Sequence, residues 1–283
     1  MRAEKHLVTT DELARHLDDP NWIVIDTRHE LTNPDTGPRV YAEGHIPGAR
    51  FMHVDHDLSG PKTGKNGRHP LPDPGELARK LNELGVGPDK QIVVYDDMGG
   101  NYAVRLWWML RWLGHGAVAL LDGGYPQWVK EGRPVSTETP APRGGSFVPR
   151  PQLGATVDVS FVERFAQSPG TRLVDARAAE RFTGQQEAID PVAGHVPGAV
   201  NRFWKQNLGP DGRFKPASQL RHEFSTLLGN LDAHDMVHMC GSGVTACHNI
   251  FAMELAGLPG SKLYPGSWSE WCADPSRPVG KGA

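Results

Sequence analysis

Uniformly apolar runs alternate with amphipathic segments along most of the chain. The runs at 22–28 (WIVIDTR) and 91–97 (QIVVYDD) become polar only at their ends, which is typical of strands covered on both faces of a parallel sheet. Segments 75–84 and 103–113 have helical spacing, and Thr10 is the predicted N-cap of a short earlier helix. The pattern therefore predicts an α/β fold, with a mainly parallel sheet flanked by helices.

The second half of the chain repeats the order of the first. Four blocks recur: LVDAR after IVIDTR, AGHVPGAVN after EGHIPGARF, MVHMCGSGVTA after IVVYDDMGGNYA, and KLYPGSWSEW after ALLDGGYPQW. Such a recurrence indicates duplication of a whole domain. The segment 138–154 is rich in Pro and Gly and reads as a linker. The sequence thus predicts two tandem domains, at 1–137 and 155–283.

The run 237–249 (VHMCGSGVTACHN) carries the strongest candidate chemistry. It reads as a strand, a Gly-Ser-Gly loop and a helix, which places Cys240 among inward-pointing N–H groups at a helix N-terminus. This environment favours a thiolate, so Cys240 is a candidate nucleophile. A buried structural cysteine is the competing interpretation. Alignment of the duplicates places Asp97 opposite Cys240, which predicts that the first domain is non-catalytic.

Composition excludes several classes of function. A net charge of −3 without a Lys/Arg block predicts no nucleic-acid binding, and the 38% hydrophobic content suits two packed cores without an apolar run long enough for a membrane span. Three cysteines are too few for a disulfide framework, and the N-terminus lacks a signal peptide's apolar core, so we expect a cytoplasmic protein. The spacing of His234, His238 and His248 matches no zinc motif, so no metal or cofactor is expected.

The repeated blocks resemble the rhodanese-type sulfurtransferases of the tandem-domain kind. The resemblance is carried by GHIPGA and GHVPGA, DTR and DAR, DGG, PGSWSEW and the loop CGSGVTA. It implies two rhodanese-like domains in which Cys240 takes a sulfane sulfur from a small donor and becomes a persulfide. The persulfide then passes its sulfur to a thiol acceptor, such as thioredoxin or a low-molecular-weight thiol, or to cyanide.

The loop is most similar to that of members that use 3-mercaptopyruvate. Members that use thiosulfate carry basic residues directly after the cysteine, whereas Gly241 and Ser242 are neutral. Thiosulfate is a compact dianion, while mercaptopyruvate carries its charge away from its sulfur. Mercaptopyruvate is thus the expected donor, with a thiosulfate:cyanide sulfurtransferase and a non-enzymatic sulfur-carrier or interaction module as alternatives. A cysteine phosphatase is disfavoured because Ala246 stands where its chemistry needs an arginine.

The resemblance also implies how the donor is bound. Arg181 matches the arginine that faces the substrate, and we expect it to hold the donor's carboxylate or keto oxygen by bidentate hydrogen bonds. The competing interpretation is a surface arginine paired with Glu180 or Glu187.

A second arginine is missing from the expected place. Members that use mercaptopyruvate carry it shortly before the GHIPG-type block, but no arginine lies between Phe182 and Gly194. Either Arg202 or Lys205 substitutes for it, or the donor is held more weakly.

Further roles follow from the same resemblance. Ser242 is expected to relay a proton, and His45 is a candidate catalytic residue, although its repeat partner His195 suggests a structural task instead. Trp268 is a candidate wall of the donor pocket, with core packing as the competing interpretation. The loop N–H groups would stabilise the persulfide, which adds these binding positions: Gly241, Gly243, Val244, Thr245 and Ala246.

Overall fold

The computed structural model describes residues 6–141 and 144–282, which divide into two compact units. The first unit comprises the described parts of Met1–Gly60, Pro72–Gln152 and Pro210–Phe214, and the second comprises those of Pro61–Leu71, Leu153–Gly209 and Lys215–Ala283. The main division lies inside the expected linker. Two segments differ from the predicted domain bounds, because 61–71 and 210–214 each belong to the unit built mostly from the other half of the sequence.

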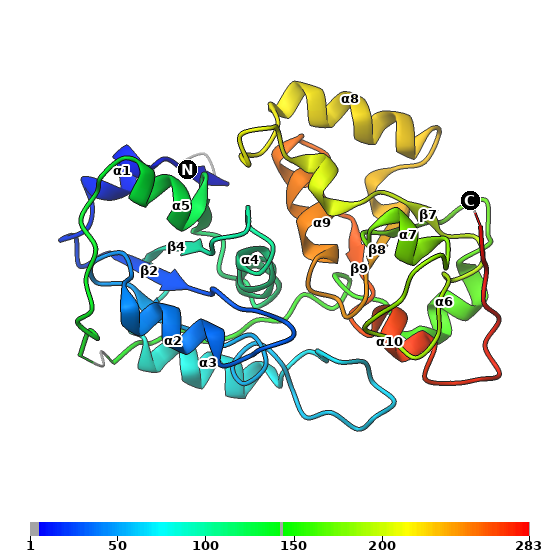
Figure 1. Ribbon diagram of the computed structural model, residues 1–283, viewed down its shortest axis with the longest axis horizontal. Coiled ribbons are helices and arrows are strands. Elements are labelled where there is room, and N and C mark those ends of the chain that lie inside the picture. Colours follow the sequence, from blue (N-terminus) through cyan, green and yellow to red (C-terminus); the bar gives the residue numbers. More distant parts are fainter. Residues whose placement is uncertain (1–5, 142–143, 283) are drawn as a thin grey trace. The chain divides into compact units, whose positions relative to one another are not determined.

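The first unit is an α/β layer structure. Its elements are β1 (Leu7–Val8), α1 (Thr10–Ala14), β2 (Trp22–Asp26), α2 (Thr36–Glu43), β3 (Arg50–Phe51), α3 (Pro74–Glu83), β4 (Gln91–Tyr95), α4 (Ala103–Trp112), β5 (Val118–Leu121) and α5 (Gly124–Lys130). The strands pair in parallel in the order β1-β5-β4-β2-β3, with α1 and α5 on one face and α2 and α3 on the other (Figure 1).

The second unit repeats this plan. Its elements are α6 (Val159–Phe165), β6 (Arg172–Asp175), α7 (Ala179–Phe182), β7 (Val200–Asn201), η1 (Trp204–Asn207), α8 (Ala217–Leu228), η2 (Ala233–Asp235), β8 (Met236–Met239), α9 (Ala246–Leu255), β9 (Lys262–Leu263) and α10 (Ser267–Trp271). The strands are parallel in the order β7-β6-β8-β9. The predicted α/β fold with parallel sheets is therefore confirmed in both units.

Alternating side chains of the central strands form the cores. In the second unit, Val237 and Met239 of β8 pack against Val162 of α6 and Trp268 of α10. Between them, His238 points to the opposite face and reaches Met253 of α9. Uniformly apolar strands thus bury both faces, as the pattern predicted. One local prediction is wrong by a residue, because the side chain of Thr9, and not of Thr10, caps α1 by accepting from the N–H of Glu12.

Strand register corrects the alignment of the two loops. Asp26 pairs with Tyr95 in the first unit, and its repeat equivalent Asp175 pairs with Met239 in the second. The residue that follows is Asp96 in the first unit and Cys240 in the second, so Asp97 is not the counterpart of the cysteine. The alignment failed because the first loop is one residue longer: seven positions separate 96 from 103, where α4 begins, and six separate 240 from 246, where α9 begins.

The loop of the first unit is filled by its own carboxylate. Four backbone N–H groups donate to the two oxygens of Asp96, those of Met98, Gly100, Tyr102 and Ala103. Burial raises the pKa of Asp96, although these donors oppose the rise. This loop has the geometry of an anion-binding cradle, and the chain itself supplies the anion.

The buried His238 makes the second unit sensitive to acid. Burial lowers its pKa from 6.5 to about 3, whereas the unfolded chain keeps an ordinary imidazole. The unfolded state therefore binds a proton first, and stability that is present above pH 6.5 is lost as the pH falls towards 3. From about pH 7 to about pH 5 we expect this group to remove about 2 kcal/mol from the free energy of unfolding.

Urea titrations at the two pH values check this expectation. His238→Leu should lose about 2 kcal/mol less than wild type between them, because leucine does not titrate. His222→Leu is the matched control, since His222 is exposed on α8. An equal loss in wild type and His238→Leu would contradict the assignment.

Candidate active site

Cys240 lies directly after β8, at the carboxyl edge of the second sheet. Its Sγ accepts the N–H groups of Gly243, at 3.1 Å, and Ser242, at 3.4 Å. The hydroxyl of Ser267 accepts the N–H of Cys240 itself, at 3.1 Å. The sulfur thus accepts two backbone N–H groups, which can stabilise negative charge on it.

The loop keeps this shape because of one glycine. Gly243 has a φ of +77°, and a Cβ there would clash with the carbonyl oxygen of Pro265. The helix α9 then begins at Ala246, so its N-terminus lies at the end of the loop. Val244 and Ala246 are buried, while Thr245 makes no side-chain capping bond. These residues shape the cradle through their backbone.

Ser242 has a histidine partner within the second unit. Its Oγ lies 2.7 Å from Nδ1 of His69, and both residues are buried. His69 belongs to the segment 61–71. A hydroxyl that touches an imidazole can pass a proton in either direction, depending on which ring nitrogen carries the hydrogen. The loop therefore combines a nucleophile with a hydroxyl–imidazole pair.

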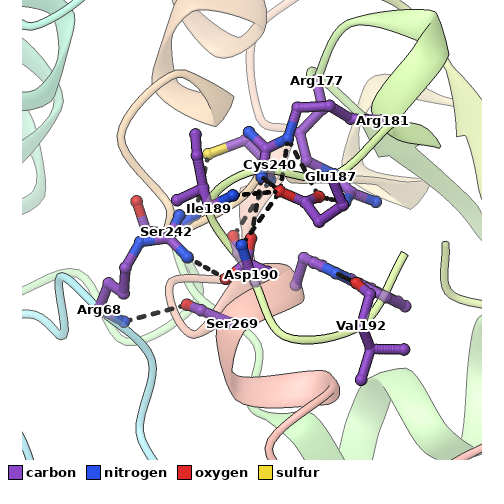
Figure 2. Close-up of polar contacts among 12 residues, drawn as sticks. Arg68, Arg177, Arg181, Glu187, Ile189, Asp190, Val192, Cys240, Ser242 and Ser269 are labelled. Atoms are coloured by element: carbon purple, nitrogen blue, oxygen red, sulfur yellow. Dashed lines mark hydrogen bonds and ion pairs between the residues drawn. The ribbon is translucent and has the colours of Figure 1, made fainter. Parts of the chain in front are cut away.

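Several charged side chains lie close to the Cys240 loop (Figure 2). Nε and Nη2 of Arg181 donate to the carboxylate of Glu187 at 2.8 to 3.1 Å, and Nη2 also reaches Asp190 at 2.9 Å. Arg68 donates to the other oxygen of Asp190. Arg177 is paired with Asp175 at 2.7 Å. Arg181 thus pairs with Glu187, as the competing interpretation expected, and its guanidinium also lies near Gly241 of the loop.

The segment that carries Arg68 is fixed to the start of α10. A Cβ at Gly67 would lie 2.7 Å from the carbonyl oxygen of Gly266, and the N–H of Arg68 donates to Oγ of Ser269 at 3.0 Å. The composition of 58–74, rich in Pro, Gly and Lys, is typical of a surface loop. The segment has no regular secondary structure, yet His69 is 3% exposed, so its end is part of the second unit's interior.

Two expected contacts are placed elsewhere. His45 belongs to the first unit, where Nδ1 and Nε2 contact the carbonyl oxygens of Tyr41 and Glu138 at 2.8 and 3.1 Å, which supports the structural task. Trp268 is fully buried, with the guanidinium of Arg177 over its ring at 4.7 Å. Its use as a pocket wall is therefore corrected to core packing, because a fully covered ring leaves no surface for a donor.

The expected substitutes for the missing arginine are also engaged elsewhere. Arg202 donates to Glu223 at 2.8 Å and to Asn207, and it lies over the ring of Phe224. The ammonium of Lys205 lies over the ring of Trp204. The arginines that lie near Gly241 are Arg68 and Arg181, so the expected substitution by Arg202 or Lys205 is wrong.

Arg68 and His69 could have been found through the repeat. Gly67-Arg68-His69 matches Gly212-Arg213-Phe214, and these matched triplets lie in the two exchanged segments. In the first unit, Phe214 lies against Gly100 of the Asp96 loop, as His69 lies against Ser242 of the Cys240 loop. Equivalent segments thus complete equivalent loops.

The remaining cysteines and histidines do not extend the site. Cys247 donates to the carbonyl oxygen of Gly243. Burial raises the pKa of Cys272 to about 11, so Cys272 stays a thiol. In the first unit the potential ligand atoms of His29, His53 and Asp55 lie within 4.8 Å of one another. However, His53 uses Nε2 towards the carbonyl of Pro34 and Nδ1 towards the N–H of Asp55, so it offers no lone pair to a metal ion.

Across the described ranges, no helix combines the length and the apolar character that crossing a membrane requires.

Comparison with known proteins gives a consistent result. The model of the rhodanese-like domain matches twice, at residues 9–131 and 159–274. A probable 3-mercaptopyruvate sulfurtransferase from Pseudomonas aeruginosa is 49% identical over 278 residues, which cover 98% of each chain. The thiosulfate sulfurtransferase of Mus musculus is 35% identical, over 89% of this chain and 85% of the relative. The solved 3-mercaptopyruvate sulfurtransferase from Leishmania major aligns with a TM-score of 0.84 at 32% identity, covering 95% of this chain and 75% of that one.

Proposed function

This chain belongs to the rhodanese-like family of sulfurtransferases, and from that premise we propose that it transfers a sulfane sulfur from 3-mercaptopyruvate through a persulfide on Cys240. The observation that carries the proposal is the position of Sγ, which accepts two loop N–H groups at the N-terminus of α9. Those donors stabilise the thiolate before the reaction and the persulfide afterwards.

The proposed first step needs no reactant besides the Cys240 thiolate and mercaptopyruvate. The Cys240 thiolate attacks the donor's sulfur, the sulfur–carbon bond breaks, and the electron pair stays on carbon as the enolate of pyruvate. The proton of the donor thiol must then reach that carbon, which leaves a persulfide anion and pyruvate. Ser242 and His69 are the hydroxyl–imidazole pair that moves this proton, because the backbone N–H of Ser242 contacts the sulfur and its hydroxyl is hydrogen-bonded to His69.

Positive charge near the loop supports an anionic donor. Arg181 lies against Gly241, and Glu187 holds it through Nε and Nη2. Its Nη1 group can therefore donate to the carboxylate of mercaptopyruvate. In the second half-reaction, we propose that a small thiol, a thioredoxin-type protein or cyanide removes the outer sulfur. Since none of the three cysteines forms a disulfide, we extend the proposal to a reducing, cytoplasmic setting.

Steady-state kinetics with two donors tests the proposed function. With a dithiol or cyanide as acceptor, we expect kcat/KM for mercaptopyruvate to exceed that for thiosulfate by at least about tenfold. The reason is that the Ser242–His69 pair serves only a donor whose leaving group needs a proton. Equal or greater efficiency with thiosulfate would replace this donor assignment by that of a thiosulfate sulfurtransferase.

A further inference from the structure

Ser267 has a backbone conformation that is unusual for a residue with a side chain. Its φ is +54°, and every other positive φ among the residues that the structure describes belongs to a glycine. An L side chain in this left-handed region is strained, because its Cβ comes close to a carbonyl oxygen. Ser267 is fully buried and is the first residue of α10. Its contacts therefore have to explain why the strain is kept.

The first unit builds the same turn with a glycine. Matching KLYPGSWSEW with ALLDGGYPQW pairs Ser267 with Gly124, which has a φ of +58°. The N–H that follows Gly124 donates to the carbonyl oxygen of Asp96 at 2.9 Å, and the N–H that follows Ser267 donates to that of Cys240 at 3.0 Å. A Cβ at Gly124 would lie 2.4 Å from the same oxygen of Asp96. Glycine is thus the unstrained choice for this turn, and the unit that carries the nucleophile has a serine instead.

The Ser267 hydroxyl makes two contacts that a glycine cannot make. It donates its proton to the carbonyl oxygen of Tyr264 at 2.9 Å, and its oxygen accepts the N–H of Cys240 at 3.1 Å. Because a hydroxyl has a single proton, the bond to Tyr264 leaves the lone pairs of the oxygen for Cys240. One oxygen atom therefore connects the backbone of the nucleophile to the turn that follows β9.

The two loops hold their first residue in different ways. The side chain of Asp96 fixes itself, because its carboxylate accepts four backbone N–H groups. Sγ of Cys240 accepts the N–H groups of Ser242 and Gly243, and sulfur is the weaker acceptor. The position of Sγ thus depends more on the backbone that carries it, which is the backbone that Ser267 contacts.

We propose that Ser267 is a positioning residue for the nucleophile. Its hydroxyl fixes the peptide N–H of Cys240 and so holds Sγ against the loop donors, and this contact is the reason that a strained serine replaces glycine. The inference rests on the proposed function for the identity of the nucleophile. Without the hydroxyl, the Cys240 peptide is released, Sγ makes poorer contacts with Ser242 and Gly243, and the thiolate is less stable.

Alkylation of Cys240 by iodoacetamide tests this role without any sulfur donor. Ser267→Ala and Ser267→Gly both remove the hydroxyl, and each should lower the rate constant of alkylation at neutral pH by about tenfold, the effect of about one hydrogen bond to a charged group. Peptide fragmentation identifies the cysteine that reacts. Ser261→Ala is the matched control, since Ser261 is also buried but precedes β9, and it should react as wild type does.

Thermal unfolding of the same two variants separates the hydroxyl from the strain. Glycine accepts a positive φ and alanine does not, so Ser267→Ala should unfold about 3 °C below Ser267→Gly. The two variants should nevertheless be alkylated equally slowly. A role confined to holding the fold predicts the opposite change in rate, because Cys240 is 2% exposed and a loosened fold would expose it to the reagent.

Alkylation at the wild-type rate or faster in both variants would overturn the proposal. Slow alkylation of Ser267→Ala alone would also overturn it, because the strain and not the hydroxyl would then govern the thiolate. If Ser267→Ala does not fold, Ser267→Gly decides alone, because it has the residue that the first unit uses in this turn. Failure of mercaptopyruvate turnover in wild type would refute the proposed function instead, and the alkylation rates would still decide the role of Ser267.

Discussion

Replacement of Cys240 by serine is expected to lower sulfur transfer by at least about 10³-fold with either donor. A serine hydroxyl at this position is not ionised at neutral pH and forms no persulfide. The backbone around the side chain should survive, because the loop is shaped by Gly243 and by the N–H bond of residue 240 to Ser267. Steady-state rates with mercaptopyruvate and thiosulfate measure the loss.

Cys272→Ser is the matched control for that experiment. Cys272 is a buried thiol at the C-cap of α10, and its raised pKa keeps it protonated. We expect this variant to keep its activity within about threefold of wild type. Substantial activity in Cys240→Ser, or a comparable loss in Cys272→Ser, would contradict the choice of nucleophile.

Removal of the hydroxyl–imidazole pair is expected to separate the two donors. Ser242→Ala and His69→Gln should each lower kcat with mercaptopyruvate by about 10²-fold, the usual contribution of a positioned proton-transfer group. Sulfite leaves thiosulfate as a stable anion and needs no proton. With thiosulfate, both variants should therefore stay within about threefold of wild type.

The thiosulfate reaction is the internal control for these variants. An equal loss with both donors would show that Ser242 and His69 act by holding the loop, because a distorted loop would impair every attack by Cys240. No loss with mercaptopyruvate would show that the proton takes another route. Both results would contradict the relay, while leaving Cys240 as the nucleophile.

Features that depend on neighbours in sequence were predictable. The strands, the Gly-Ser-Gly loop and the position of Cys240 at the carboxyl end of β8 follow from local apolar runs and glycines. The repeat gave the two-domain plan. The matching of Asp97 to Cys240 failed because an alignment that starts from the helices does not detect one extra loop residue, whereas strand register places Asp96 there.

Features that depend on chain exchange between the units were not predictable from local patterns. Arg68 and His69 lie in a polar stretch without periodicity, so nothing nearby indicates that His69 becomes buried against Ser242. Their place follows only from packing of the segment 61–71 with the second unit. The matched Gly-Arg pairs at 67–68 and 212–213 were the available signal, and they become meaningful once the exchange is known.

The most direct test of the central claim is the mass of the peptide that contains Cys240 after treatment with mercaptopyruvate in the absence of an acceptor. The proposed chemistry predicts a gain of one sulfur atom on that peptide, with one pyruvate released per chain, and reversal of the gain when cyanide or a thiol is added. Pyruvate release without added sulfur on Cys240, or added sulfur on Cys247 or Cys272 instead, would contradict the account.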